Sequence, residues 1–122
     1  QVWEAVNMVA HFKLDNLFTI VEKPFTTVDP DKPGVVKIDQ IQDKFEAFGW
    51  KVVQVIDGHD FDDLLDGFVK AFNVSRRPVC LLCNTVAGKS IEFAERKHAY
   101  LNANLSHAEM ADVVAKMQSI YE

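Results

Sequence analysis

Short apolar runs and longer amphipathic stretches alternate along the chain. Three apolar runs, rich in β-branched and aromatic residues, are too short for helices and predict buried strands. These runs cover residues 17–21, 51–56 and 79–85. Around them, apolar residues recur at helical spacing. The predicted helices cover residues 1–13, 38–48, 60–73 and 106–121. Consecutive strand–helix–strand units imply right-handed crossovers, so the pattern predicts an α/β fold with a parallel sheet flanked by helices.

The first and second predicted helices differ in their apolar surface. Residues 1–13 are apolar around most of the helix circumference, which predicts a helix buried by its neighbours, with His11 as a satisfied core residue. Residues 38–48 show an amphipathic pattern. We expect Asp39 to cap that helix and Gly49 to end it.

The third and fourth predicted helices begin at recognisable caps. Asp60 is a good N-cap residue, and Ser106 with Glu109 fits a capping box. Each helix is expected to bury one apolar stripe. The stripes consist of Phe61, Leu64, Leu65, Phe68 and Phe72, and of Met110, Val113, Val114, Met117 and Tyr121.

The segment after the first strand is the first place to look for chemistry. Residues 23–34 contain three prolines and a glycine, which predicts a series of turns. Ligands of open α/β sheets bind just beyond the carboxyl ends of the strands. The polar residues from Glu22 to Asp29 should therefore lie at a ligand-binding edge.

Length and charge limit the function classes. The 122 residues fit one domain over 1–122, and the net charge of -5 argues against a non-specific nucleic-acid binder, although not against a locally held phosphate. Apolar runs fall short of the ~20 residues of a membrane span, and the N-terminus does not resemble a signal peptide. We therefore expect a cytoplasmic protein. The chain opens on Gln1 inside a helical pattern, which suggests that a start is missing.

Cysteine and histidine positions favour structural roles. Cys80 and Cys83 lie three apart in a predicted strand and should point to opposite faces, which favours core packing over a zinc or redox pair. His59, between Asp residues at a strand end, is either a base or ligand, or part of an Asx turn and helix cap, and we favour the cap. His98 and His107 are expected to be solvated.

Two further clusters allow alternatives. The spacing around Gly88-Lys89-Ser90 excludes a phosphate-binding P-loop, because Cys83 stands where the first glycine would be. Lys89 is then either near a ligand's phosphate or in a solvated turn. Glu22 and three aspartates offer oxygen ligands for Mg²⁺, but their spacing in the sequence does not specify a metal site. This favours the interpretation that they are surface carboxylates. The aspartates are Asp29, Asp31 and Asp39.

Five collinear motifs resemble the thiamine-diphosphate-binding part of transketolases, especially the separate N-terminal subunit of split transketolases. They are QVWEA at 1–5, HFKLDNLFTIV at 11–21, FEAFGW at 45–50, DGHD at 57–60 and TVAGK at 85–89. The resemblance implies that this chain corresponds to the C-terminal portion of a thiamine-diphosphate-binding domain and has its fold. It also implies transfer of a two-carbon ketol unit between sugar phosphates, with thiamine diphosphate and Mg²⁺ as cofactors.

This chain departs from the family's cofactor site at several of the positions that the resemblance identifies. The family's Gly-Asp-Gly metal motif would precede Gln1, and its Asn ligand corresponds to Pro24, which cannot ligate through its side chain. The backbone carbonyl of Thr26 corresponds to a further metal ligand. A family histidine near the diphosphate corresponds to Leu101. The cofactor-binding residues implied by the resemblance are Glu22, Thr26 and Lys89; the catalytic residues are unknown.

Two functional hypotheses follow from the resemblance. In the first, the chain is a transketolase-like subunit that works with a C-terminal-type partner subunit or by self-association, with the metal held by Glu22, Thr26 or Thr27. In the second, it is a degenerate or truncated relative with a structural or regulatory role. The resemblance assigns the apolar helix faces to subunit contact and so implies an oligomer, and neither nucleic acid nor membrane is an expected partner.

Overall fold

The computed structural model describes residues 1–25 and 40–121, which cluster into two compact units. The first unit holds the described residues up to Thr85, and the second holds those from Val86 onward. The elements of the first unit are α1 (Val2–His11), β1 (Phe18–Phe25), α2 (Ile41–Ala47), β2 (Lys51–Val55), α3 (Phe61–Phe72) and β3 (Val79–Val86), whose last residue belongs to the second unit. The second unit also contains the short 3-10 helix η1 (His98–Tyr100) and α4 (His107–Tyr121).

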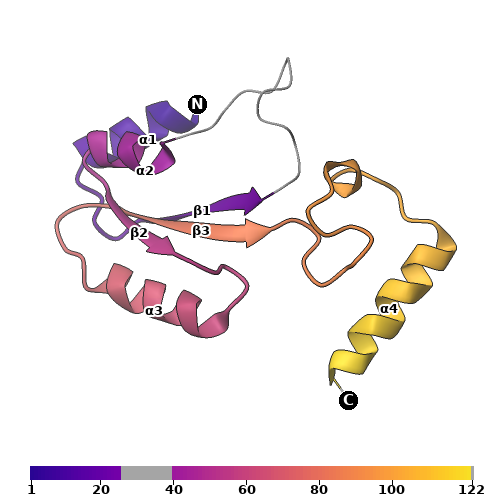
Figure 1. Ribbon diagram of the computed structural model, residues 1–122. Coiled ribbons are helices and arrows are strands. Elements are labelled where there is room, and N and C mark those ends of the chain that lie inside the picture. Colours follow the sequence, from indigo (N-terminus) through magenta and orange to yellow (C-terminus); the bar gives the residue numbers. More distant parts are fainter. Residues whose placement is uncertain (26–39, 122) are drawn as a thin grey trace. The chain divides into compact units, whose positions relative to one another are not determined.

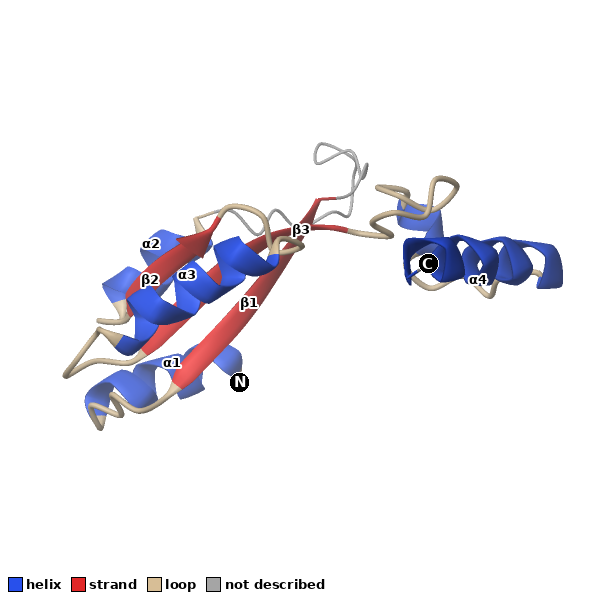
Figure 2. Ribbon diagram, turned by 90° about the horizontal axis from the view of Figure 1, so that it is seen from below, coloured by secondary structure: helices blue, strands red, loops and turns tan. Residues whose placement is uncertain are grey.

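The first unit is a three-stranded sheet with helices on both faces. The strand order is β1-β3-β2, and β2 pairs in parallel with β3 from Lys51 opposite Val79 to Val55 opposite Cys83. Figure 1 shows β1 pointing in the same direction as β3, with α1 and α2 on one side of the sheet and α3 on the other. Figure 2 shows the same layers from below. The predicted parallel α/β fold is confirmed.

The edge strand β1 differs from its prediction in two ways. It runs to Phe25, so that Glu22, Lys23 and Pro24 extend the strand instead of opening a turn. Ile20 is 59% exposed, so the prediction that this strand is buried is wrong. Both differences follow from its place at the edge of the described sheet, where proline is tolerated and one side lacks a neighbouring strand.

Two apolar cores lie on opposite faces of the sheet. The core beneath α1 and α2 consists of Val6, Phe45, Trp50, Val52, Cys80 and Leu82. The core beneath α3 consists of Val53, Val55, Ala71, Val79, Leu81 and Cys83. In the first core, Trp50 Nε1 donates a hydrogen bond of 2.9 Å to the Val6 carbonyl, which fixes α1 to the start of β2. Cys80 and Cys83 are free thiols on opposite faces, as predicted.

Burial of the Cys80 thiol leads to a pH dependence of stability. Desolvation raises its pKa from an ordinary 9.0 to about 12. A thiol whose pKa is higher in the folded state than in the unfolded state holds its proton more tightly in the folded state. Its contribution to stability is fully present below the unfolded-state pKa and is lost as the pH rises toward the folded-state pKa. We expect the free energy of unfolding, measured in urea, to fall more between pH 9 and 10.5 for the wild type than for Cys80→Ala. Equal slopes in the two proteins would contradict this.

Two helices bury less of their surface than the sequence predicts. On α1 only Val6 is buried, Val2 and Phe12 are more than 60% exposed, and His11 is exposed instead of belonging to the core. The predicted all-round burial of this helix is therefore wrong within the described residues, because α1 packs on one side only. On α3 the buried residues are Gly67 and Ala71, and much of its predicted stripe faces outward. The exposed stripe residues are Phe61, Leu65 and Phe72.

The predicted helix caps are largely confirmed. Asp60 Oδ1 accepts hydrogen bonds from the backbone N–H groups of Asp62 at 2.8 Å and Asp63 at 3.2 Å. In the second unit, Glu109 Oε2 accepts from Ser106 N at 2.8 Å, and Ser106 Oγ accepts from Glu109 N at 3.3 Å. Gly49, with φ of 88°, follows α2 as expected. Asp39 lies outside the described residues.

The second unit consists of turns followed by α4. Tyr100 Oη donates a hydrogen bond of 3.0 Å to Glu109 Oε1, which ties η1 to the first turn of α4. Of the predicted stripe on α4, Val113 is half-buried, whereas Met110, Val114 and Met117 are 45–56% exposed. The side chain of Tyr121 lies outside the described part. Within the described ranges, none of the helices is long and apolar enough to cross a membrane.

Candidate functional site

The carboxyl ends of β1 and β3 meet at a polar edge of the first unit. Thr85 Oγ1 donates a hydrogen bond of 3.0 Å to Glu22 Oε1, which joins the two strands near their carboxyl ends. The Thr85 side chain is only 9% exposed, so its hydroxyl is held in place. Glu22 was expected at this edge, and the structure places it there as part of a strand.

A small hollow of about 210 Å³ opens beside this contact. It is lined by Lys23, Pro24, Asn84 and Thr85. Lysine and asparagine side chains carry N–H donors that suit an oxyanion. The hollow is therefore a candidate site for a phosphate-bearing ligand, and sequence analysis missed Asn84, which carries no motif of its own.

The described residues of this edge do not suit a divalent metal. Mg²⁺ needs several oxygen ligands in octahedral order. Pro24 offers no side-chain oxygen at the position of the expected Asn ligand, and the Glu22 carboxylate at this edge accepts the hydrogen bond from Thr85. No group of three or more His, Cys, Asp or Glu suitable for a metal occurs in the part of the chain that the structure describes. Thr26, Thr27, Asp29 and Asp31 lie outside that part.

The turn after β2 packs against the same edge. Asp57 Oδ1 accepts a hydrogen bond of 2.9 Å from His59 N, and Asp57 N donates to Asp63 Oδ2 at 3.1 Å. Gly58 N donates to the Asn84 carbonyl at 2.7 Å. This is the Asx turn and helix cap favoured for the DGHD motif, so His59 has a structural role through its backbone.

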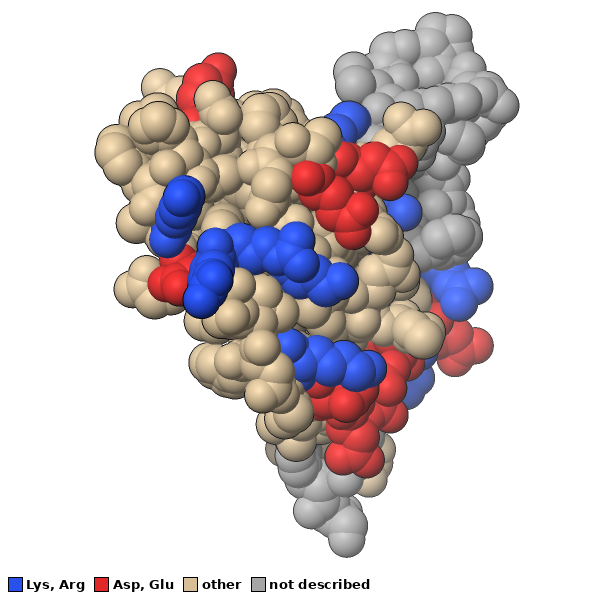
Figure 3. All heavy atoms as spheres, turned by 90° about the vertical axis from the view of Figure 1, so that its left-hand side faces the viewer, with Lys and Arg blue, Asp and Glu red and all other residues tan. Residues whose placement is uncertain are grey.

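Basic side chains gather at the opposite end of the strands. Figure 3 shows Lys and Arg side chains in the middle of the face at the left of Figure 1, with acidic side chains around them. Lys51 opens β2, and Arg76 and Arg77 precede β3, so these three residues lie at the amino ends of the strands. Lys23 lies instead near the carboxyl end of β1, next to the hollow.

Lys89 belongs to the second unit, where it lies in a glycine turn. Lys89 N donates to the Val86 carbonyl at 3.2 Å, and the Lys89 side chain is exposed. Gly88 has φ of 70°, and a Cβ there would lie 2.7 Å from the Ala94 carbonyl oxygen, so only glycine fits. The turn is confirmed, and a role for Lys89 in cofactor binding stays a prediction. Leu101 is 45% exposed, and His98 and His107 are exposed as expected.

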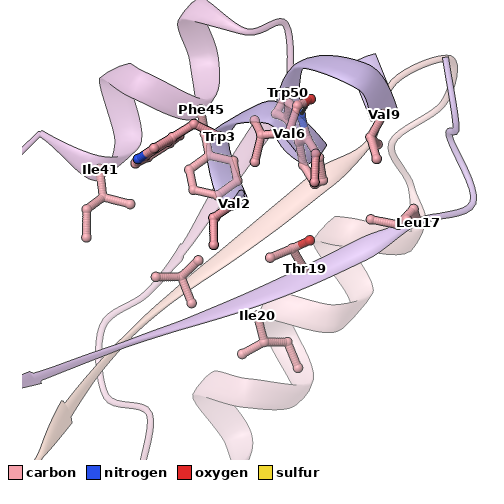
Figure 4. Close-up of a pocket in the computed structure, with 12 residues that line it drawn as sticks. Val2, Trp3, Val6, Val9, Leu17, Thr19, Ile20, Ile41, Phe45 and Trp50 are labelled. Carbon is pink, nitrogen blue, oxygen red and sulfur yellow. Dashed lines mark hydrogen bonds between the residues drawn. The ribbon is translucent and has the colours of Figure 1, made fainter. Parts of the chain in front are cut away.

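A larger apolar cleft of about 560 Å³ lies between α1, α2 and β1. Figure 4 shows Trp3, Phe45 and Trp50 from the helix side and Thr19 and Ile20 from β1 around it. The lining contains no charged side chain. A diphosphate would find no charged side chain in this cleft, whereas apolar side chains would find apolar surface to pack against. The sequence signal for this surface is the all-round apolar pattern of residues 1–13, which predicts a helix buried by its neighbours.

Comparison with known proteins identifies the class of domain and then its family. Residues 2–119 match the family model described as "Transketolase, thiamine diphosphate binding domain". The chain therefore belongs to the transketolase family. It is 30% identical over 118 residues to the 6-deoxy-6-sulfo-D-fructose transketolase subunit SqwG of Clostridium sp. (strain MSTE9), a match covering 97% of this chain and 42% of SqwG. It is 38% identical over 96 residues to a putative transketolase family protein of Sinorhizobium fredii, covering 78% of this chain and 34% of that protein.

Solved structures agree with the fold. A transketolase mutant from Pichia stipitis superposes with a TM-score of 0.77 and 21% identity, over 93% of this chain and 17% of that one. The chain thus spans less than half the length of the relatives that it matches. The agreement confirms the thiamine-diphosphate-binding α/β fold.

Proposed function

We propose that this chain contributes the diphosphate-binding side of a thiamine-diphosphate site in a transketolase-type enzyme that transfers a two-carbon ketol unit between sugar phosphates. The observation that carries the proposal is the family match over residues 2–119. The hollow at the carboxyl edge of β1 and β3 supports it, because this is where open α/β sheets bind ligands.

The chain's own residues orient the cofactor. Lys23 and Asn84, which line the hollow, would hold the diphosphate, and Thr85 is hydrogen-bonded to Glu22 so that the strand ends keep their spacing. The resemblance adds Thr26 and Lys89 as further cofactor contacts. When bound, thiamine diphosphate supplies the carbanion chemistry, and protein groups supply binding and orientation.

A transketolase C-terminal-type subunit is the proposed partner, docking on the apolar face of α1 and β1. Val2 is 67% exposed, Trp3 39% and Ile20 59%, and all three line the apolar cleft. Exposed apolar patches of this kind mark protein contact surfaces. The name of SqwG, a transketolase subunit, supports a second chain.

Calorimetric titration with thiamine diphosphate, with and without Mg²⁺ and with and without the candidate partner, tests the function. We expect binding of the cofactor and, with the partner present, ketol transfer between sugar phosphates. Absence of cofactor binding in every mixture would instead favour the second hypothesis, a structural or regulatory relative. The replacement of the expected metal ligand by Pro24 is the observation in favour of that alternative.

Charge placed in the apolar cleft should abolish partner binding. The double variant Trp3→Glu/Ile20→Lys introduces two unpaired charges into a contact surface, and we expect the dissociation constant to rise at least about 100-fold, since each buried unpaired charge is costly. Analytical ultracentrifugation of the mixture measures this. Phe61→Glu is the matched control, because Phe61 is 80% exposed on α3, across the sheet. Equal binding by the double variant, or equal loss in the control, would contradict the proposed surface.

A further inference from the structure

We infer that the exposed face of α3 binds a second copy of this chain, with the two α3 helices antiparallel about a two-fold axis. Figures 1 and 2 show α3 on one side of the sheet and α1 and α2 on the other, so this surface is separate from the apolar cleft. The inference goes beyond the proposed function and does not rest on it, because it requires neither the cofactor nor the partner subunit.

Four apolar side chains form a stripe along the exposed face of α3. They are separated by four, four and three residues, which places them on one side of a helix. Phe61 is 80% exposed, Leu65 61%, Val69 59% and Phe72 69%. The order of the stripe is similar in both directions, with an aromatic ring at each end and aliphatic side chains between. An exposed apolar stripe of this length marks a contact with another molecule.

The sheet-facing side of α3 is already packed, so the stripe is not a displaced part of the core. Ala71 is fully buried, and Leu64 and Phe68 pack against the core beneath the helix. A Cβ at Gly67 would lie 2.7 Å from Val55 Cγ2, which shows how closely the helix approaches the sheet. The stripe is therefore presented by a fixed helix and can bind another molecule without any change in the fold.

Charge is distributed unequally along the same segment. Residues 57–66 contain five aspartates and no lysine or arginine, whereas residues 67–77 contain one lysine, two arginines and no acidic residue. Asp62 near the start of α3 is exposed, and so are the two arginines beyond its C-terminal end. Asp15 also lies at the basic end, where its carboxylate accepts a hydrogen bond of 3.2 Å from Arg76 N. One acid there leaves the two ends of the segment with opposite net charge.

A second copy of the chain matches this surface in the antiparallel orientation. The acidic end of one α3 then meets the basic end of the other, and the two apolar stripes lie along each other. A parallel pair would instead bring like charges together, which is unfavourable. Lys70 forms an ion pair with Asp66 in its own helix, so the arginines supply the basic side of the contact. In this arrangement Asp62 of each copy faces Arg77 of the other, because a two-fold axis repeats every contact.

Sedimentation velocity of the full chain alone, over micromolar concentrations, tests the inference. We expect a monomer–dimer equilibrium for the wild type. In Leu65→Glu the dissociation constant should rise at least about 100-fold, because two carboxylates would be buried in an apolar contact near the two-fold axis. Met8→Glu is the matched control and should dimerise like the wild type, since Met8 is 49% exposed on α1, across the sheet. Circular dichroism verifies that each variant is folded.

Charge reversal tests the antiparallel orientation. Asp62→Arg and Arg77→Glu should each raise the dissociation constant about tenfold, since each change turns two attractive surface contacts into repulsive ones. An equimolar mixture of the two variants should dimerise like the wild type, because every such contact in the mixed dimer joins opposite charges. A mixture that associates no more tightly than the separate variants would overturn the inferred arrangement.

Two further results would overturn the inference. One is a wild-type chain that stays monomeric alone at every concentration at which it is soluble, even if Leu65→Glu weakens partner binding. The other is a dimer lost in Trp3→Glu/Ile20→Lys and kept in Leu65→Glu, which would place the contact at the apolar cleft. Phe61→Glu should lose the dimer and keep the partner contact, so this variant distinguishes the two surfaces.

Titration of the same samples with thiamine diphosphate keeps the inference and the proposed function apart. A dimer that is sensitive to Leu65→Glu and binds no cofactor in any mixture supports the inference and counts against the proposed function. A monomer that binds the cofactor refutes the inference and leaves the proposed function intact.

Discussion

Replacement of Trp50 with alanine is expected to lower the free energy of unfolding by about 3–5 kcal/mol, the range for large buried aromatic side chains. Trp50 is 2% exposed and packs edge-on against Phe45, with ring centroids 5.4 Å apart. Its indole N–H also donates to the Val6 carbonyl. The substitution removes apolar contacts, leaves a cavity and releases the hydrogen bond between β2 and α1.

Urea unfolding followed by circular dichroism measures this loss of stability. Two further variants separate the contribution of the ring volume from that of the hydrogen bond and compare Trp50 with the other tryptophan. Trp50→Phe keeps much of the ring volume and removes the N–H donor, so it should cost less than Trp50→Ala. Trp3→Ala removes the other tryptophan, whose side chain is 39% exposed, and should also cost less. A Trp50→Ala protein as stable as Trp3→Ala would show that Trp50 is not the centre of this core.

A Gly58→Val substitution is expected to destabilise the chain by about 1–3 kcal/mol through overpacking. A Cβ at Gly58 would lie 2.8 Å from Thr85 Cγ2 and 3.0 Å from the Asn84 carbonyl oxygen. The carbonyl belongs to the backbone of the central strand and cannot move aside without disturbing the sheet. The turn after β2 must therefore shift away from the end of β3.

The same variant should weaken the binding of thiamine diphosphate expected under the proposed function, because Asn84 and Thr85 line the hollow. Thermal unfolding and the thiamine diphosphate titration measure the two effects together. Gly49→Ala is the contrasting control: a Cβ there meets nothing within 4 Å, and the φ of 88° alone should cost about 1–2 kcal/mol. Unchanged stability in Gly58→Val would contradict the tight contact between the turn and β3.

Local patterns predicted the elements well where the deciding interactions are local. The cap at Asp60 and the capping box at Ser106 depend on side chains within three residues of the backbone groups that they bind, and both are present. The opposite orientation of Cys80 and Cys83 follows from strand geometry alone. The central strand β3 was predicted accurately because an apolar run of its length has few alternatives.

The structural features that the sequence did not predict depend on contacts between residues that are distant in the sequence. Glu22 belongs to a strand because β1 pairs with β3, which supplies Thr85 63 residues later, and no local pattern shows that pairing. Asn84 joins the candidate site only through the meeting of β1 and β3. The apolar residues of α1 were expected inside the chain, but apolar periodicity does not distinguish a face covered by the same chain from a face covered by another.

The outer edge of β1 has a consequence for how this chain behaves in a cell. β1 is an edge strand of the described sheet, and its exposed Ile20 beside an apolar cleft offers a surface for association with other copies at high concentration. A ligand or subunit that binds only the folded chain raises its apparent stability by mass action. Yield on expression should therefore rise with the amount of partner made alongside it, and chain made in excess should accumulate in the insoluble fraction.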